Sequence, residues 1–113
     1  MLGDTLSKAA RSVSDALKQT EEHKAYMEQK KIIRSDPETR KLIERARFIQ
    51  EKLMEIPESD RNSDYVDQLQ DEYEELTENT AVYEYMRVES VYVTMVQETL
   101  GTIVEDIDID IDL

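Results

Sequence analysis

The single histidine, His23, is the first residue to consider for catalysis. An imidazole can act as a general base, but it needs a hydroxyl or carboxylate partner held in a fixed arrangement. His23 stands among Glu21, Glu22 and Lys24 at the expected first turn of a helix, and no serine or aspartate motif accompanies it. We therefore predict a surface or capping role for His23, and no catalytic residue.

The sequence also offers few residues that could bind a metal or a cofactor. The chain has no cysteine, which excludes disulfides, thiolate zinc sites and iron–sulfur clusters, and one histidine cannot supply paired Glu-x-x-His motifs. Gly3 and Gly101 are too few for a phosphate-binding loop or a dinucleotide fingerprint. The alternating aspartates of residues 106–113 resemble the start of a calcium loop, but Ile111 occupies the position that requires glycine. We predict no enzymatic activity, no cofactor and no metal site.

The net charge of −13 is unevenly distributed. Residues 1–50 carry 11 basic and 8 acidic side chains, whereas residues 51–113 carry 3 and 19. Because phosphate neutralisation supplies most non-specific affinity for nucleic acids, direct DNA binding is not expected. The stretch from Lys24 to Arg47 is the exception, with eight basic residues and four acidic ones. A solvated helix face is the favoured interpretation, and direct RNA binding is the alternative.

Apolar side chains recur at steps of three and four along most of the chain, which predicts helices. A first helix begins near Asp4, and its apolar stripe breaks near Thr20, a suitable N-cap for a second helix. The second helix should end before Pro37, where Asp36 and Pro37 form a strong start signal for a third. The third helix carries a heptad-type seam made of Leu42, Ala46, Ile49, Leu53 and Ile56.

Turn-forming residues 57–62 then predict that a fourth helix folds back antiparallel to the third. Asn62 or Ser63 can cap the fourth helix, and Asn79 can cap a fifth. The fifth helix is apolar on more than one face, which is typical of a helix shared between its own core and a second chain. Gly101 within it indicates fraying or a close helix approach.

These elements predict an all-α protein of about five helices, an antiparallel helical bundle with long third and fifth helices that dimerisation would complete. We expect a single helical domain over residues 1–105 and an acidic alternating tail over residues 106–113, extended or disordered. The alternative for the tail is strand pairing with a second chain or with a partner's sheet edge.

The partner or dimer interface is expected on the fifth helix, with help from the third. Amphipathic aromatic side chains and methionines are typical interface anchors, so packing is favoured over base stacking for the tyrosines of this acidic half. The candidate residues are Tyr85, Met86, Val91, Tyr92, Met95, Val96, Ile49 and Leu53.

Three segments together resemble the YlbF/YmcA family of small helical bacterial proteins. They are residues 17–26 (LKQTEEHKAY), 35–39 (SDPET) and 78–85 (ENTAVYEY), and the resemblance spans about residues 5–104. Thr80 departs from the family pattern, in which proline is common at that position. The lack of cysteine argues against any cluster-binding role, and the acidic tail is not part of the pattern.

The resemblance implies an all-α, oligomer-forming, non-enzymatic regulator of competence, sporulation and biofilm formation that modulates ribonuclease Y. We therefore predict a regulatory adaptor acting through protein–protein interaction, which meets RNA only indirectly through a ribonuclease partner. The alternative is a stand-alone structural or chaperone-like helical oligomer without a regulatory client. Without a signal-peptide pattern or a long apolar run, we expect a cytoplasmic location and no membrane contact.

Overall fold

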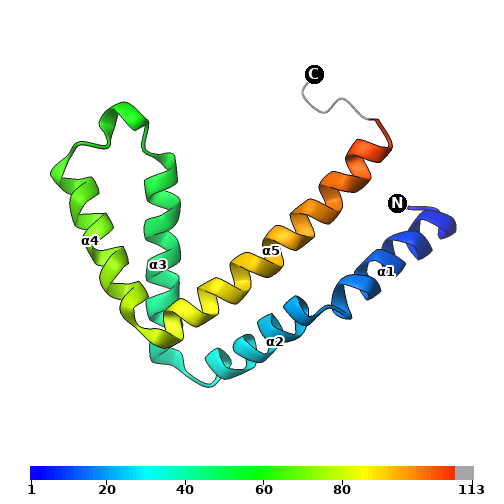
Figure 1. Ribbon diagram of the computed structural model, residues 1–113, viewed down its shortest axis with the longest axis horizontal. Coiled ribbons are helices and arrows are strands. Elements are labelled where there is room, and N and C mark those ends of the chain that lie inside the picture. Colours follow the sequence, from blue (N-terminus) through cyan, green and yellow to red (C-terminus); the bar gives the residue numbers. More distant parts are fainter. Residues whose placement is uncertain (109–113) are drawn as a thin grey trace. The chain divides into compact units, whose positions relative to one another are not determined.

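The computed structural model describes residues 1–108 and contains five α-helices (Figure 1). They are α1 (Asp4–Lys18), α2 (Glu21–Arg34), α3 (Pro37–Glu55), α4 (Asp64–Glu78) and α5 (Thr80–Asp106), with a short 3-10 helix, η1 (Glu58–Asp60), before α4. No strand occurs within residues 1–108. The all-α prediction is confirmed, as are the long third and fifth helices, which have 19 and 27 residues.

Side-chain caps set the helix starts where the sequence predicted them. The Asp36 carboxylate accepts hydrogen bonds from the Thr39 backbone N–H (3.1 Å) and hydroxyl (2.6 Å) at the start of α3. These bonds hold the pKa of Asp36 below its ordinary value. Ser63 accepts from the Val66 N–H (3.2 Å) at the start of α4.

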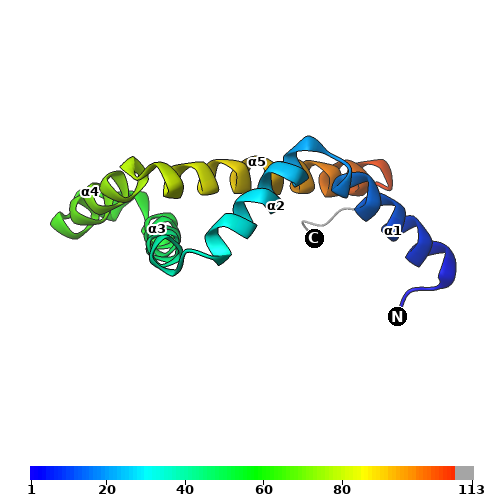
Figure 2. The same cartoon turned by 90° about the horizontal axis from the view of Figure 1, so that it is seen from below.

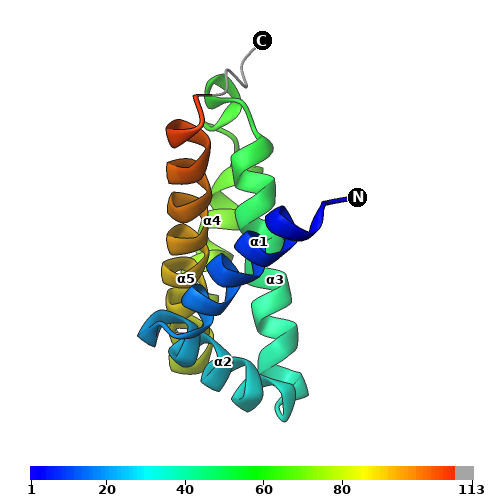
Figure 3. The ribbon, with the colours of Figure 1, turned by 90° about the vertical axis from the view of Figure 1, so that its right-hand side faces the viewer.

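Two further caps follow the same rule. Asn79 accepts from the N–H groups of Ala81 (3.0 Å) and Val82 (3.2 Å) at the start of α5. The Thr20 hydroxyl accepts from the His23 N–H (3.1 Å) and donates to the Leu17 carbonyl (2.7 Å). Thr20 therefore joins the end of α1 to the start of α2, at the bend visible in Figure 3.

The chain divides into two compact units: Met1–Glu28 with Val88–Leu113, and Gln29–Arg87. The expectation of one domain over residues 1–105 stays a prediction, and so does dimerisation. Asp106, the first residue of the predicted tail, ends α5, and residues 109–113 of that tail lie outside the described residues.

The unit Gln29–Arg87 is built around the antiparallel pair α3 and α4, which lie side by side in Figure 1. Arg45 on α3 donates two N–H bonds to the Glu72 carboxylate on α4, the longer one 2.9 Å, and this keeps the pKa of Glu72 low. The apolar core of the unit is Ile33, Ile43, Ala46, Ile49, Val66, Leu69, Val82 and Tyr85.

Along α3 the core-facing positions differ by one residue from the predicted seam at its start. Ile43 is 3% exposed, whereas its predicted neighbour Leu42 is half-buried. Ala46 and Ile49 are fully buried as expected. The core-facing stripe of α3 therefore begins at Thr39, a buried residue whose hydroxyl is satisfied by Asp36.

Within the other unit, α5 continues through Gly101 without a kink (Figure 2). A Cβ added at Gly101 would meet no atom within 4 Å, so Gly101 does not mark a close helix approach within residues 1–108. Gly101 therefore lowers the stability of α5 relative to alanine, and no packing contact within residues 1–108 requires a glycine there.

Candidate partner-binding surface

The predicted interface residues divide between the two units and between buried and exposed positions. Ile49 is 0% exposed and Tyr85 8% exposed, both within the core of the unit Gln29–Arg87. Met86 and Leu53 are half-buried in the same unit. Ile49 and Tyr85 therefore support a surface from beneath rather than forming it.

Leu53 lines an apolar hollow of about 200 Å³ on the α3–α4 pair, together with Gln50, Met54, Arg61 and Tyr73. Met54 is strongly exposed beside it. The Arg61 guanidinium donates to the carbonyls of Leu53 (3.2 Å) and Ile56 (3.4 Å), the orphan acceptors at the end of α3. Arg61 thus fixes the turn that follows α3 and forms one wall of the hollow.

Phe48 is a second exposed apolar feature of the α3 surface, with 43% of its area accessible. The Arg45 guanidinium carbon lies 5.1 Å and the Lys52 ammonium 5.6 Å from the centre of its ring, both within cation–π range. Arg45 is also bonded to Glu72, which orients its guanidinium group beside the ring. An aromatic ring framed in this way suits a partner that brings both apolar and acidic groups.

In the unit formed by Met1–Glu28 and Val88–Leu113, helix α1 has no buried residue. The apolar stripe that the sequence predicted is only partly covered within residues 1–108. Leu6 is 62% exposed, and Val13 and Leu17 are half-buried. An exposed apolar stripe of this kind is a candidate surface for protein binding.

One face of α5 in the same unit is covered by α2. The Tyr92 ring stacks on Tyr26 with ring centres 5.2 Å apart and meets His23 edge-on at 5.3 Å. Met95 is half-buried and Val88 is buried. His23 therefore has a packing role on α5 in addition to its capped backbone N–H, and no hydroxyl or carboxylate partner of a catalytic type is bonded to its ring among the described residues.

A different face of α5, continued by Ile107 just after the helix ends, carries a largely exposed apolar seam. Its members are Val93, Val96, Leu100, Ile103 and Ile107, which follow one another at steps of three and four residues. Four are substantially exposed: Val93 42%, Leu100 54%, Ile103 39% and Ile107 57%. We call these five residues the α5 seam. Such spacing is the seam of a coiled coil, in which each side chain enters a hole on a facing helix.

Of the predicted interface residues on α5, only Val96 belongs to the α5 seam. Val91 is 47% exposed, but a separation of two residues places it about half a turn from Val93. Sequence reasoning missed Val93, Leu100, Ile103 and Ile107, although their three-and-four spacing was available as a signal.

Within residues 1–108, no group of three or more His, Asp or Glu side chains is arranged to hold a metal ion. Among the same residues, no helix is both long and apolar enough to cross a membrane. The geometry thus offers apolar surfaces on α1, α3 and α5 as its main features.

A family model described as "Control of competence regulator ComK, YlbF/YmcA" matches residues 6–108. The chain belongs to the YlbF/YmcA family. The match extends over nearly all of the five helices, so the resemblance on the three quoted segments is confirmed. Neither a curated protein nor a solved structure matches the chain. YlbF/YmcA proteins are regulatory by the description of the family, and regulation is the coarse function of this member.

Proposed function

We propose that this YlbF/YmcA protein is a non-enzymatic regulatory adaptor that works by binding other helical protein surfaces. The observation that carries the proposal is the α5 seam, which presents apolar side chains at coiled-coil spacing, four of the five substantially exposed within residues 1–108. The apolar stripe of α1 in the same unit adds a second face that is partly exposed within residues 1–108.

The α5 seam is suited to one or two partner helices. Knobs at steps of three and four fit a partner helix that crosses at about 20°. The part of α5 that carries the seam is acidic. It includes Glu98 and Glu105, and the segment from Val88 to Asp108 contains no basic residue. A partner with Lys or Arg beside its own apolar stripe would complement this charge and associate faster.

The finer pathway rests on family membership. We infer that the partners belong to the control of competence, sporulation or biofilm formation, and that the effect is exerted by modulating ribonuclease Y. In this role the protein would meet RNA only through the ribonuclease. The lone histidine packed on Tyr92 supports an adaptor rather than an enzyme.

Affinity purification of the full chain from native cells, followed by crosslinking and mass spectrometry, tests this proposal. The expected result is recovery of ribonuclease Y or of related helical subunits, with crosslinks to residues beside the α5 seam. Replacing Val93 and Leu100 with glutamine should remove these partners. The matched control is Val91→Gln, which changes an equally exposed valine on another face of the same helix and should keep them. Recovery of the same partners by all three chains would contradict the proposal.

A stand-alone structural or chaperone-like oligomer is the second candidate function, because the α5 seam of one chain can pack against the same seam of a second copy. We expect a dimer at least through α5, with help from α3. In this case the purified chain self-associates, and no ribonuclease, RNA-processing factor or related subunit accompanies it from cells. Recovery of a specific partner in stoichiometric amount excludes this alternative.

A further inference from the structure

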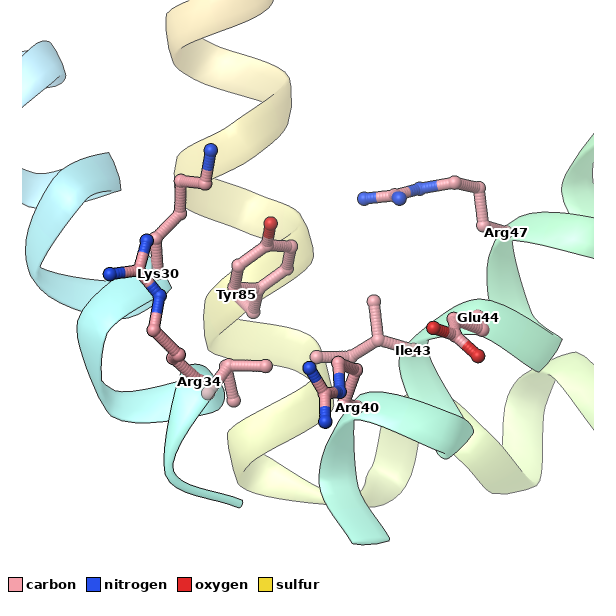
Figure 4. A pocket seen from close by; sticks show the side chains of 8 residues that line it. Lys30, Arg34, Arg40, Ile43, Glu44, Arg47 and Tyr85 are labelled. Carbon is pink, nitrogen blue, oxygen red and sulfur yellow. The ribbon is translucent and has the colours of Figure 1, made fainter. Parts of the chain in front are cut away.

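A hollow of about 220 Å³ in the unit Gln29–Arg87 is surrounded by positive charge (Figure 4). Its polar lining consists of Lys30, Arg34, Arg40, Arg47, Glu44 and Tyr85. Four cations thus face one carboxylate, in a chain whose net charge is −13. This concentration of positive charge is independent of the α5 seam and plays no part in the adaptor function proposed above.

Helical spacing explains how these residues meet. Lys30 and Arg34 are four residues apart on α2, and Arg40, Glu44 and Arg47 follow one another by four and three on α3, so each group shares one face of its helix. The chain reverses between the two helices at Ser35 and Asp36. Figure 4 shows the Tyr85 ring from α5 between the α2 side chains and those of α3.

The floor of the hollow is formed by buried and largely apolar side chains. Ile33 is 6%, Ile43 3% and Tyr85 8% exposed, and all three belong to the core of the unit. A cationic rim over a fixed apolar floor is the arrangement of a small-ligand site, in which a few polar groups orient a ligand that also makes apolar contact.

Two arginines of the hollow differ from the ion-paired arginines of the same unit. Arg45 is bonded to Glu72, and Arg87 to Glu84, in the same unit. Arg34 and Arg40 form no ion pair or side-chain hydrogen bond within residues 1–108, although the chain has 27 acidic residues. Placing Arg34 and Arg40 around one hollow brings like charges together, and a bound anion offsets their mutual repulsion.

We propose that this hollow binds the phosphate group of a small ligand, such as a nucleotide. Guanidinium groups present N–H donors in a planar fork that matches phosphate oxygens, and they keep their charge at any physiological pH. Recognition by side-chain charges needs no glycine-rich loop, which this chain cannot form. The apolar floor receives the organic part of the ligand.

Size and charge favour a small ligand over a long polyanion. A hollow of about 220 Å³ accommodates a phosphate group with part of its substituent, and not a folded chain. A polynucleotide extending beyond the hollow would meet a protein in which acidic residues outnumber basic ones 27 to 14. A small phosphate ligand is therefore favoured over RNA at this site.

Isothermal titration of the full chain with pyrophosphate, with ADP, with succinate and with a short single-stranded oligoribonucleotide tests this proposal. The variant pair is Arg34→Gln with Arg40→Gln. The matched control is Lys31→Gln with Lys41→Gln, which removes the same charge from exposed positions on the same two helices that do not line the hollow. Circular dichroism confirms that all three chains are equally helical.

We expect pyrophosphate and ADP to bind the unsubstituted chain and the lysine variant with affinities within about twofold of each other. Because a hydrogen bond to a charged group contributes about 1.5–3 kcal/mol, losing both arginines should weaken binding about a hundredfold or more.

Four results would overturn the proposal. Absence of pyrophosphate and ADP binding at low salt removes the site, and equal weakening by the arginine and lysine pairs reduces it to non-specific charge. Succinate binding as tightly as pyrophosphate replaces phosphate with carboxylate as the ligand group. Tighter binding of the oligoribonucleotide than of ADP through the same arginines makes the site an RNA contact, contrary to the small ligand proposed.

Discussion

The pair Val91 and Val93 allows a sharp test of the α5 seam, because two valines on one helix have nearly equal exposure but lie on different faces. Val91 is 47% and Val93 42% exposed. Glutamine is a better helix former than valine, so neither Val91→Gln nor Val93→Gln should weaken α5 itself. Any difference between the two variants therefore reports what contacts each face.

The magnitude follows from the exposed fractions of the α5 seam. Val93 and Leu100 leave 42% and 54% of their surface accessible. Full burial of such a side chain contributes about 1.5–3 kcal/mol, so covering the remaining fractions contributes about 1.5–3 kcal/mol for the pair. In a symmetric dimer both chains lose this contribution, about 6 kcal/mol at most, which weakens the dimer by a factor of about 10²–10⁴.

Sedimentation equilibrium across a wide concentration range measures this change directly. We expect the unsubstituted chain and Val91→Gln to dimerise with equal affinity, and the double variant Val93→Gln with Leu100→Gln to be monomeric at the same concentrations. The reasoning is refuted if the unsubstituted chain is monomeric at micromolar concentration, or if Val91→Gln weakens the dimer as much as the double variant. Circular dichroism of each chain verifies that the helices persist.

Three further predictions concern stability. Gly101→Ala should raise the free energy of unfolding by about 0.8–1 kcal/mol in thermal denaturation, since a Cβ there meets open space, and an unchanged or lowered value would contradict this. Ile49→Ala should lower it by about 2–5 kcal/mol in urea denaturation, because the side chain is 0% exposed, whereas a loss below 1 kcal/mol would place Ile49 outside a close-packed core. Arg45 and Arg87 hold the pKa values of Glu72 and Glu84 below 4.5, so these pairs stabilise the fold fully above that pH and lose their contribution as pH falls through the lowered values. Urea midpoints at several pH values should fall on acidification, and less steeply in Arg45→Gln.

Local signals predicted the helix starts well because each start depends on residues close in sequence. Asp36, Ser63 and Asn79 accept from backbone N–H groups two or three residues ahead, and no distant contact is needed to form these caps. The proline after Asp36 ended one helix and began the next for a purely local reason. These helix boundaries could therefore be predicted from neighbouring residues alone.

The sequence predicted less well which face of a helix is buried, because α3 and α5 each carry apolar residues on more than one face. On α3, Leu42 and Ile43 are adjacent and both strongly apolar, and only packing against other elements of the unit decides that Ile43 is the buried one. On α5, the interface was predicted at Tyr92, on the face that α2 covers, whereas Val93 and Leu100 on another face remain exposed. Periodicity reveals apolar faces, but it does not say which of them the chain covers itself.

The two units differ in a way that matters for an adaptor. The unit Gln29–Arg87 has an apolar core of eight buried side chains, whereas within residues 1–108 the other unit buries only Val88. A unit with little buried surface opens at low free energy, and any protein that binds its closed form stabilises it in proportion to concentration and affinity. Covering α1 and the α5 seam would therefore do more than attach a partner. If the adaptor function proposed above holds, the partner would add buried apolar surface to a unit that has little of its own, and the stability of the unit would then rise with the concentration of its partner.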